Sequence, residues 1–182
     1  SVALDGSHTP AKRGGQLVGY QGRKKAATTN MLFLTVWQGL PLAWSDPMGG
    51  QHHDMFETVA VPSKKCFQKV ATLQRAGINS EGLFLNGDAR FNAQKMREIC
   101  EQHGIIVNLE RNKKNRVNPN TEGYLFDGEL YKERFALKKT NAWIDGFKAL
   151  LVRYEINARY WLSLPYLAIT FMLLQRKGVC DN

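Results

Sequence analysis

The sequence has 182 residues and a formal net charge of +9, from 25 Lys and Arg against 16 Asp and Glu. With 43% hydrophobic and 10% aromatic residues, the chain can build its own core, which excludes a disordered protein and predicts one domain over residues 1–182. The positive excess favours a polyanionic partner, either nucleic acid or an anionic membrane surface.

The cysteines and the longest apolar run exclude two classes of protein. Cys66, Cys100 and Cys180 are far apart and form no C-x-x-C pair, so reduced thiols in a cytoplasmic protein fit better than structural zinc or a disulfide framework. The strongest apolar run, residues 161–174, contains Pro165 and has 14 residues, whereas a bilayer span needs about 20. We therefore expect a buried helix there and no membrane partner.

The elements predicted for the first third of the chain are mainly β-strands. Residues 1–5 alternate between apolar and polar side chains, which predicts a strand. Residues 6–29 hold five glycines and five basic residues, which predicts a mobile basic connection. Aromatic and β-branched content predicts a strand over residues 31–38, and Gly39 turns it into a hairpin with residues 40–45.

The rest of the chain alternates helices with strands. A polar stretch with Pro and Gly predicts a loop over residues 110–128. A strand–helix–strand unit in the middle implies a right-handed parallel crossover. Apolar spacing of three and four predicts helices over residues 63–75, 92–103, 132–151 and 157–176, and short apolar runs predict strands over residues 82–88 and 105–109.

Several patterns that carry chemistry elsewhere are absent or weak. The two phosphate-binding glycine patterns, G-x-x-x-x-G-K-[ST] and G-x-G-x-x-G, are both absent around Gly14 and Gly15. A flexible loop is therefore the better interpretation of these glycines. Ser7 does not lie in the G-x-S-x-G motif of a nucleophile elbow, and no cysteine is accompanied by an obvious general base. The His-His-Asp run at residues 52–54 fits a capped helix start better than a metal site, because adjacent side chains point apart.

Asp5 and Asp88 differ from these because each follows a predicted buried strand. Ligand sites in α/β sheets form at the carboxyl ends of parallel strands, so the two carboxylates are candidates to converge. Oxygen ligands on stiff strands suit Mg²⁺, and two such ions about 4 Å apart clamp the attacking and leaving oxygens of a phosphoryl displacement. On the residues alone, the alternative that both are turn residues at strand ends stays open.

Basic residues cluster before and on the helix predicted at 132–151. Aromatic residues such as Tyr131 and Trp143 are interleaved with them, which favours a surface for a nucleic-acid backbone. A solvated helix face is the ordinary alternative. The cluster comprises Arg111, Lys113, Lys114, Arg116, Lys132, Arg134, Lys138 and Lys139.

Three stretches, taken in order, resemble one family. They are LDGSHT at 4–9, LFLNGDARF at 83–91, and LYKER at 130–134 continuing through TNAW at 140–143 to LLVRY at 150–154. Together they resemble the catalytic domain of bacterial insertion-sequence transposases of the DDE class, over residues 2–174. The resemblance implies a ribonuclease H-like fold of the α/β class: a mixed sheet flanked by helices, with two C-terminal helices.

The resemblance also implies a site. Asp5 and Asp88 match the first two catalytic carboxylates, which in the family hold Mg²⁺ or Mn²⁺. The third motif of the family reads Tyr-x2-Arg-x3-Glu-x6-Lys; Tyr131 and Arg134 match it, but Lys138 stands at the position of the catalytic Glu. A lysine there removes a metal ligand and adds a cation, so we expect weakened metal binding and impaired catalysis.

Two further positions depart from the family. Asp145 stands where the third motif has Lys, and Arg90 stands where the second motif has Gly. The partner that the resemblance implies is DNA, both transposon ends and target, with a homodimer on DNA as a further expectation. The candidate DNA-binding residues are Arg23, Lys24, Lys25, Lys113, Lys114, Tyr131, Arg134 and Lys139.

Three functions remain open from the sequence. The first is a transposase-type catalytic domain, the second an inactive relic that only binds DNA, and the third a related structure-selective nuclease supported by shared fold alone. Because the chain begins at Ser1 on a predicted core strand, we expect a fragment without the amino-terminal DNA-binding domain that such families usually carry.

Overall fold

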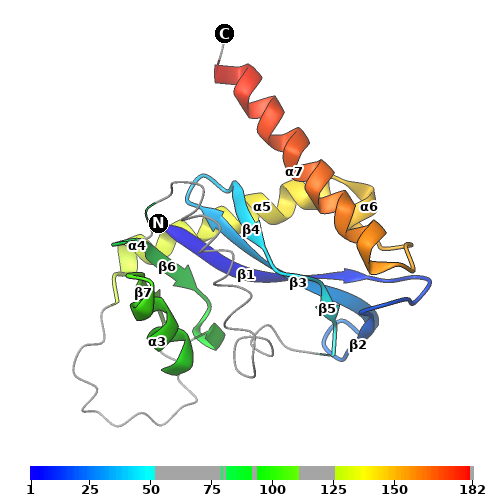
Figure 1. The fold of residues 1–182 in the computed structure, drawn as a ribbon, viewed down its shortest axis with the longest axis horizontal. Helices are drawn as coiled ribbons and strands as arrows, with labels where there is room; N and C mark the ends of the chain where they lie inside the picture. The colour runs from blue at the N-terminus through cyan, green and yellow to red at the C-terminus, as the bar shows by residue number, and fades with distance from the viewer. Residues whose placement is uncertain (52–78, 80, 92–93, 111–125, 181–182) are drawn as a thin grey trace.

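The computed structural model describes residues 1–51, 79, 81–91, 94–110 and 126–180. In these residues a mixed sheet is flanked by helices, which confirms the α/β class (Figure 1). The strand order is β2-β3-β1-β6-β7, with two short strands, β4 and β5, also paired to β3. The helix predicted at 63–75 and the His-His-Asp run at 52–54 lie outside the described residues.

The antiparallel half of the sheet is longer than expected. β1 (Val2–Pro10) pairs along its whole length with β3 (Ala26–Val36), and β2 (Gly19–Gln21) extends the sheet beyond β3. The prediction of a mobile connection over residues 6–29 is therefore wrong, because it contains half of β1, all of β2 and the start of β3. Gly14 and Gly15 have positive φ in the connection between β1 and β2, whereas Thr28, Thr29 and Asn30 are fully buried.

The expected hairpin is present. Gly39 has φ +83°, a conformation that favours glycine, and joins β3 to β4 (Pro41–Trp44), which runs antiparallel to it. β5 (Met48–Gly49) pairs with the other end of β3.

The parallel half of the sheet follows the predicted order. β6 (Phe84–Gly87) pairs in parallel with β1, and β7 (Ile106–Leu109) pairs in parallel with β6. Between them lie a short 3₁₀ turn, η1 (Ala89–Phe91), and helix α3 (Gln94–Gln102). This confirms the strand–helix–strand unit expected for the middle of the chain.

The helix predicted over residues 132–151 is divided and begins earlier. It consists of α4 (Gly128–Lys132), η2 (Glu133–Phe135), α5 (Ala136–Asp145) and α6 (Lys148–Leu151). Asp127 caps α4 by accepting hydrogen bonds from two backbone N–H groups. The helix therefore begins at Gly128, earlier in the sequence than predicted. The last helix, α7 (Ala158–Cys180), begins near its predicted start and contains Pro165.

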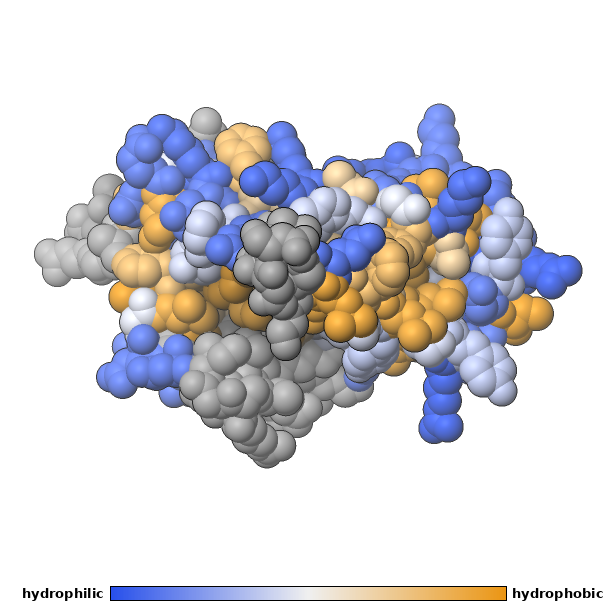
Figure 2. Space-filling view, turned by 90° about the horizontal axis from the view of Figure 1, so that it is seen from above, coloured by the Kyte–Doolittle hydropathy of each residue, from blue (hydrophilic) through white to orange (hydrophobic). Residues whose placement is uncertain are grey.

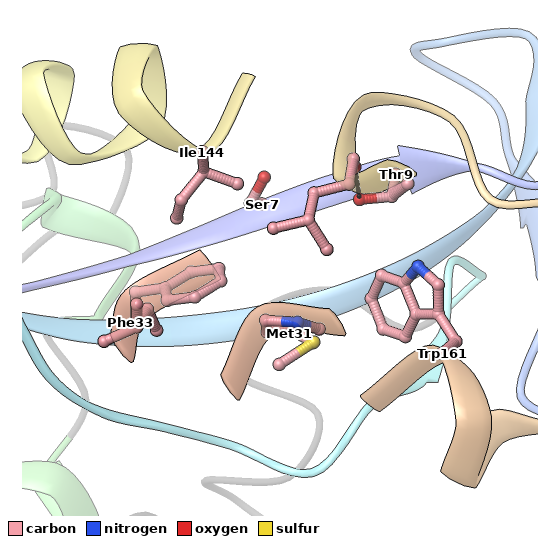
Figure 3. Close-up of a pocket in the computed structure, with 9 residues that line it drawn as sticks. Ser7, Thr9, Met31, Phe33, Ile144 and Trp161 are labelled. Carbon is pink, nitrogen blue, oxygen red and sulfur yellow. Dashed lines mark hydrogen bonds between the residues drawn. The ribbon is translucent and has the colours of Figure 1, made fainter. Parts of the chain in front are cut away.

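Hydrophobic clusters cover both faces of the sheet. Side chains alternate along β3, so Leu32 and Leu34 join the cluster formed with side chains of β6, β7 and α3, while Met31 and Phe33 join the cluster formed with side chains of α5 and α7. A gap of about 10 Å³ remains beside Trp161 in the second cluster (Figure 3), which is room for one water molecule and not for a ligand.

Helix α7 continues beyond the sheet (Figure 1). Apolar side chains gather on the face seen from above in Figure 2. On α7 the exposed large hydrophobic residues are Tyr160, Tyr166, Leu167, Phe171, Leu173 and Leu174. Among the described residues, none of the helices is long and apolar enough to cross a membrane.

Candidate active site and adjoining groove

Asp5 and Asp88 lie next to one another on adjacent parallel strands. Leu4 of β1 is paired in register with Gly87 of β6, and each aspartate follows directly. β1 continues to Pro10, so Asp5 is not at the end of its strand as expected. It stands instead where the pairing with β6 ends. Beyond it, among the described residues, no second strand pairs with β1 as far as Pro10, whose carbonyl accepts a hydrogen bond from the N–H of Arg153 (2.8 Å).

The two carboxylates open into one pocket, which we call the carboxylate pocket. It has a volume of about 170 Å³ and lies between the sheet and the η2–α5 segment. Its lining residues are Leu4, Asp5, Asp88, Arg134, Phe135, Leu137, Lys138 and Asn141. The structure thus brings together residues that are far apart in the sequence and that the resemblance places in one site.

A buried hydrogen-bond ladder fixes the start of α4 above the strand ends. The Asn108 amide donates to Asn86 Oδ1 (2.8 Å) and to the carbonyl of Asp127 (3.0 Å), and Asn108 Oδ1 accepts from the N–H of Asp127 (2.8 Å). Both asparagines are almost completely buried. The strands therefore determine where the helical segment that carries Tyr131 and Arg134 begins.

Tyr131 and Arg134 form a stacked pair beside the carboxylates. The Arg134 guanidinium lies 4.8 Å from the centroid of the Tyr131 ring, and the Tyr131 hydroxyl donates to Glu110 at 3.5 Å. Burial raises the pKa of Tyr131 above 10.0, Arg134 opposes the shift, and Glu110 and Asp88 add to it. Tyr131 is thus coupled electrostatically to one of the two candidate metal ligands.

Position 138, where the resemblance implies a glutamate, is a lysine. Lys138 lines the carboxylate pocket, and its ammonium lies 4.5 Å from the centroid of the Phe135 ring. Thr140 anchors this part of α5, because its hydroxyl donates to the carbonyl of Gly39 (2.7 Å) in the β3–β4 turn. Helix α5 is therefore held against the sheet, with Lys138 among the residues that line the carboxylate pocket.

The donor set fits a divalent cation only in part. Two carboxylates supply the hard oxygen ligands that Mg²⁺ prefers, but Lys138 supplies none. Among the described residues, no group of three or more His, Cys, Asp or Glu is arranged to hold a metal ion.

A second, larger cavity adjoins the pocket, and we call it the β1-edge groove. It has a volume of about 840 Å³ and shares Asp5 and Asn141 with the carboxylate pocket. Its other lining residues are Gly6, Ser7, His8, Thr9, Pro10, Gln21, Arg23, Lys24, Gln51, Asp145, Leu150, Leu151 and Val152.

The predicted DNA-binding residues fall into four groups. Arg23 and Lys24 line the β1-edge groove, and Arg134 lines the carboxylate pocket with Tyr131 stacked behind it. Lys25 and Lys139 are exposed and line neither cavity. Lys113 and Lys114 lie outside the described residues.

Asn141 is the residue that sequence reasoning missed at this site. It lies three residues after Lys138 on α5 and lines both cavities. Residues three apart share a helix face, so that spacing was the available signal.

The comparisons with known proteins support the fold at low sequence similarity. No family model matches the sequence, and no curated protein is similar to it in sequence. Among solved structures, a piggyBac transposase in a synaptic complex with hairpin DNA is similar, with a TM-score of 0.58 and 9% identity. The similarity covers 92% of this chain and 44% of that one. The chain therefore has a transposase-like fold and spans less than half the length of that transposase.

Proposed function

We propose that this chain is the catalytic-type domain of a DDE transposase of the insertion-sequence class, with a ribonuclease H-like core, and that Lys138 impairs its catalysis. The observation that carries the proposal is the meeting of Asp5 and Asp88 with position 138 at one pocket. The strand order, with β1 central between an antiparallel and a parallel half, supports the ribonuclease H-like arrangement.

The proposed substrate is DNA at transposon ends and at the target. Asp5 and Asp88 would hold one divalent cation, Mg²⁺ or Mn²⁺, which supplies Lewis-acid activation and charge neutralisation for phosphoryl transfer when bound. Arg134 faces the same pocket and is suited to contact a phosphate with its planar guanidinium.

The second candidate function is a domain that binds DNA without cutting it. The specific observation in its favour is Lys138, because a basic residue lining the same pocket as two carboxylates adds positive charge that opposes the entry of a divalent cation. Both candidates make the same contacts with DNA and differ in their response to the metal.

The Lys138→Glu substitution tests which candidate holds. We expect Mn²⁺ to raise the melting temperature of Lys138→Glu, because an ion bound only to the folded state stabilises it by about 2.7 kcal/mol at a hundredfold excess over Kd. The unsubstituted chain should show a smaller shift, because its metal binding is weakened, and no Mg²⁺-dependent strand cleavage. Lys138→Glu should recover part of that cleavage, with Arg90→Gly as a second change if the single one is not enough.

Lys139→Glu is the matched control, because it makes the same change of charge at an exposed neighbouring position outside the pocket. An equal Mn²⁺ effect in Lys139→Glu would contradict a specific site. If the parent chain cleaves DNA and Asp5→Asn does not, catalysis is intact and another carboxylate completes the site. If Lys138→Glu gains neither metal binding nor cleavage, the non-cutting domain is the better candidate.

A further inference from the structure

We infer that the β1-edge groove binds an unpaired DNA strand and leads it to the carboxylate pocket. The inference takes from the proposed function only that the partner is DNA. It adds the form of the DNA, a single strand, and the surface that selects it.

The groove exists because β1 extends further than β6, the strand that pairs with it in parallel. β6 pairs only with Val2–Leu4, so in the described part of the chain residues 5–10 of β1 have a strand, β3, on one side only. The groove follows this edge and joins the carboxylate pocket through Asp5 and Asn141. A chain lying along the edge would therefore reach the two aspartates at one end.

The two sides of the groove differ in charge. Arg23 and Lys24, in the turn between β2 and β3, supply two cations on one side, and the Lys24 ammonium donates to the carbonyl of His8 (2.9 Å). Asp145 and the apolar side chains of Leu151 and Val152 supply the other side.

This asymmetry suits one strand rather than two. A single strand has one line of phosphates, which can follow the cationic side while its bases turn toward the apolar side. A duplex has two phosphate backbones, and one of them would meet Asp145. A cavity of about 840 Å³ is also within the range of a pocket for one small ligand, a size that suits a short stretch of one strand better than the full width of a duplex.

Polar side chains between the two sides are already held in position. Gln21 donates to the carbonyl of Gly50 (3.2 Å) and accepts from the N–H of Arg23 (3.3 Å). The His8 ring is 3.2 Å from the hydroxyl of Thr28. Amide and imidazole groups can match the donors and acceptors on base edges, and their fixed positions reduce the entropy lost on binding.

Binding to paired and tailed duplexes tests the inference. Fluorescence anisotropy would compare a blunt duplex with the same duplex carrying a single-stranded tail of about five nucleotides, a length within the range of single-strand sites. We expect the parent chain to bind the tailed duplex about tenfold more tightly. Arg23→Ala should lose most of that preference, because it removes a phosphate contact inside the groove.

Arg159→Ala is the matched control, since it removes an exposed arginine on α7 outside the groove. It should weaken binding to both duplexes alike and keep the tail preference. Equal binding of tailed and blunt duplexes by the parent would overturn the inference while leaving the proposed function intact. Equal binding of an RNA tail would overturn the assignment to DNA, and no binding to any DNA would contradict both proposals.

Discussion

Tyr131 is the residue whose ionisation reports on the carboxylate pocket. Burial, Glu110 and Asp88 raise its pKa above 10.0 in the folded chain. A raised folded-state pKa means that the folded state binds the proton more strongly than the unfolded state does. The stability from this difference is complete below pH 10 and is lost as the pH rises through the folded-state value.

We therefore expect the parent chain to lose stability more steeply above pH 10 than Tyr131→Phe does. Urea unfolding at several alkaline pH values measures the difference. Arg134 opposes the shift, so Arg134→Gln should raise the pKa of Tyr131 further, detectable by phenolate absorbance against an Arg134→Gln/Tyr131→Phe blank. A lower pKa in Arg134→Gln would contradict this account of the pair.

At the scale of elements, the Asn86–Asn108–Asp127 ladder connects strands to a helix. Asn108→Leu deletes three hydrogen bonds at once and leaves the Asp127 backbone N–H without its acceptor. Asn86 Oδ1 is buried and also loses its donor, and an unsatisfied buried polar group costs about 1–3 kcal/mol, so we expect the free energy of unfolding to fall by about 3 kcal/mol. Hydrogen exchange in α4 should also become faster.

Asp127→Ala provides the comparison for the ladder. It removes the cap of α4 but keeps the backbone groups that pair with Asn108, and loss of such a cap costs about 1 kcal/mol. If Asn108→Leu is no more destabilising than Asp127→Ala, the ladder does not position α4.

Some of these elements could be predicted from local patterns and others could not. The parallel pairing of β6 with β7 followed from short apolar runs around a helical segment. The adjacency of Asp5 and Asp88 was also predicted, although Asp5 lies within β1 and not at its end as the prediction assumed. The length of β1 did not follow, because Gly6 and polar neighbours conceal a strand whose buried residues depend on β3. The spacing of Asn141 from Lys138 indicated a shared helix face, but the position of Asn141 at the β1-edge groove depends on the packing of α5 against β1, which the sequence does not show.

At the scale of the whole molecule, the net charge of +9 sets how binding responds to salt. Each phosphate contact releases condensed counterions, so a protein making about 6–10 contacts loses about 10³–10⁵ in affinity between 50 and 200 mM salt. We expect a steep decrease for duplex DNA, measured by anisotropy at several salt concentrations. Duplexes of unrelated sequence should bind similarly, because phosphate contacts carry no sequence information.

Affinity that stays constant over this salt range would contradict a binding surface made mainly of Lys and Arg. A strong dependence on duplex sequence would instead indicate direct contacts with base edges. Either result would mean that particular side chains, and not the net charge, determine binding, and neither would bear on the fold.

The central place of β1 also determines the order in which the sheet can be assembled. β1 and β3 are close in the chain and can form a hairpin early, but β6 begins only at Phe84. Until then, the edge that carries Val2–Leu4 is an unpaired template of the kind that recruits foreign strands. Parallel pairing across so long a separation is intrinsically slow. Nascent or refolding chains should thus be most vulnerable to aggregation before β6 docks, at the strand on which the candidate site depends.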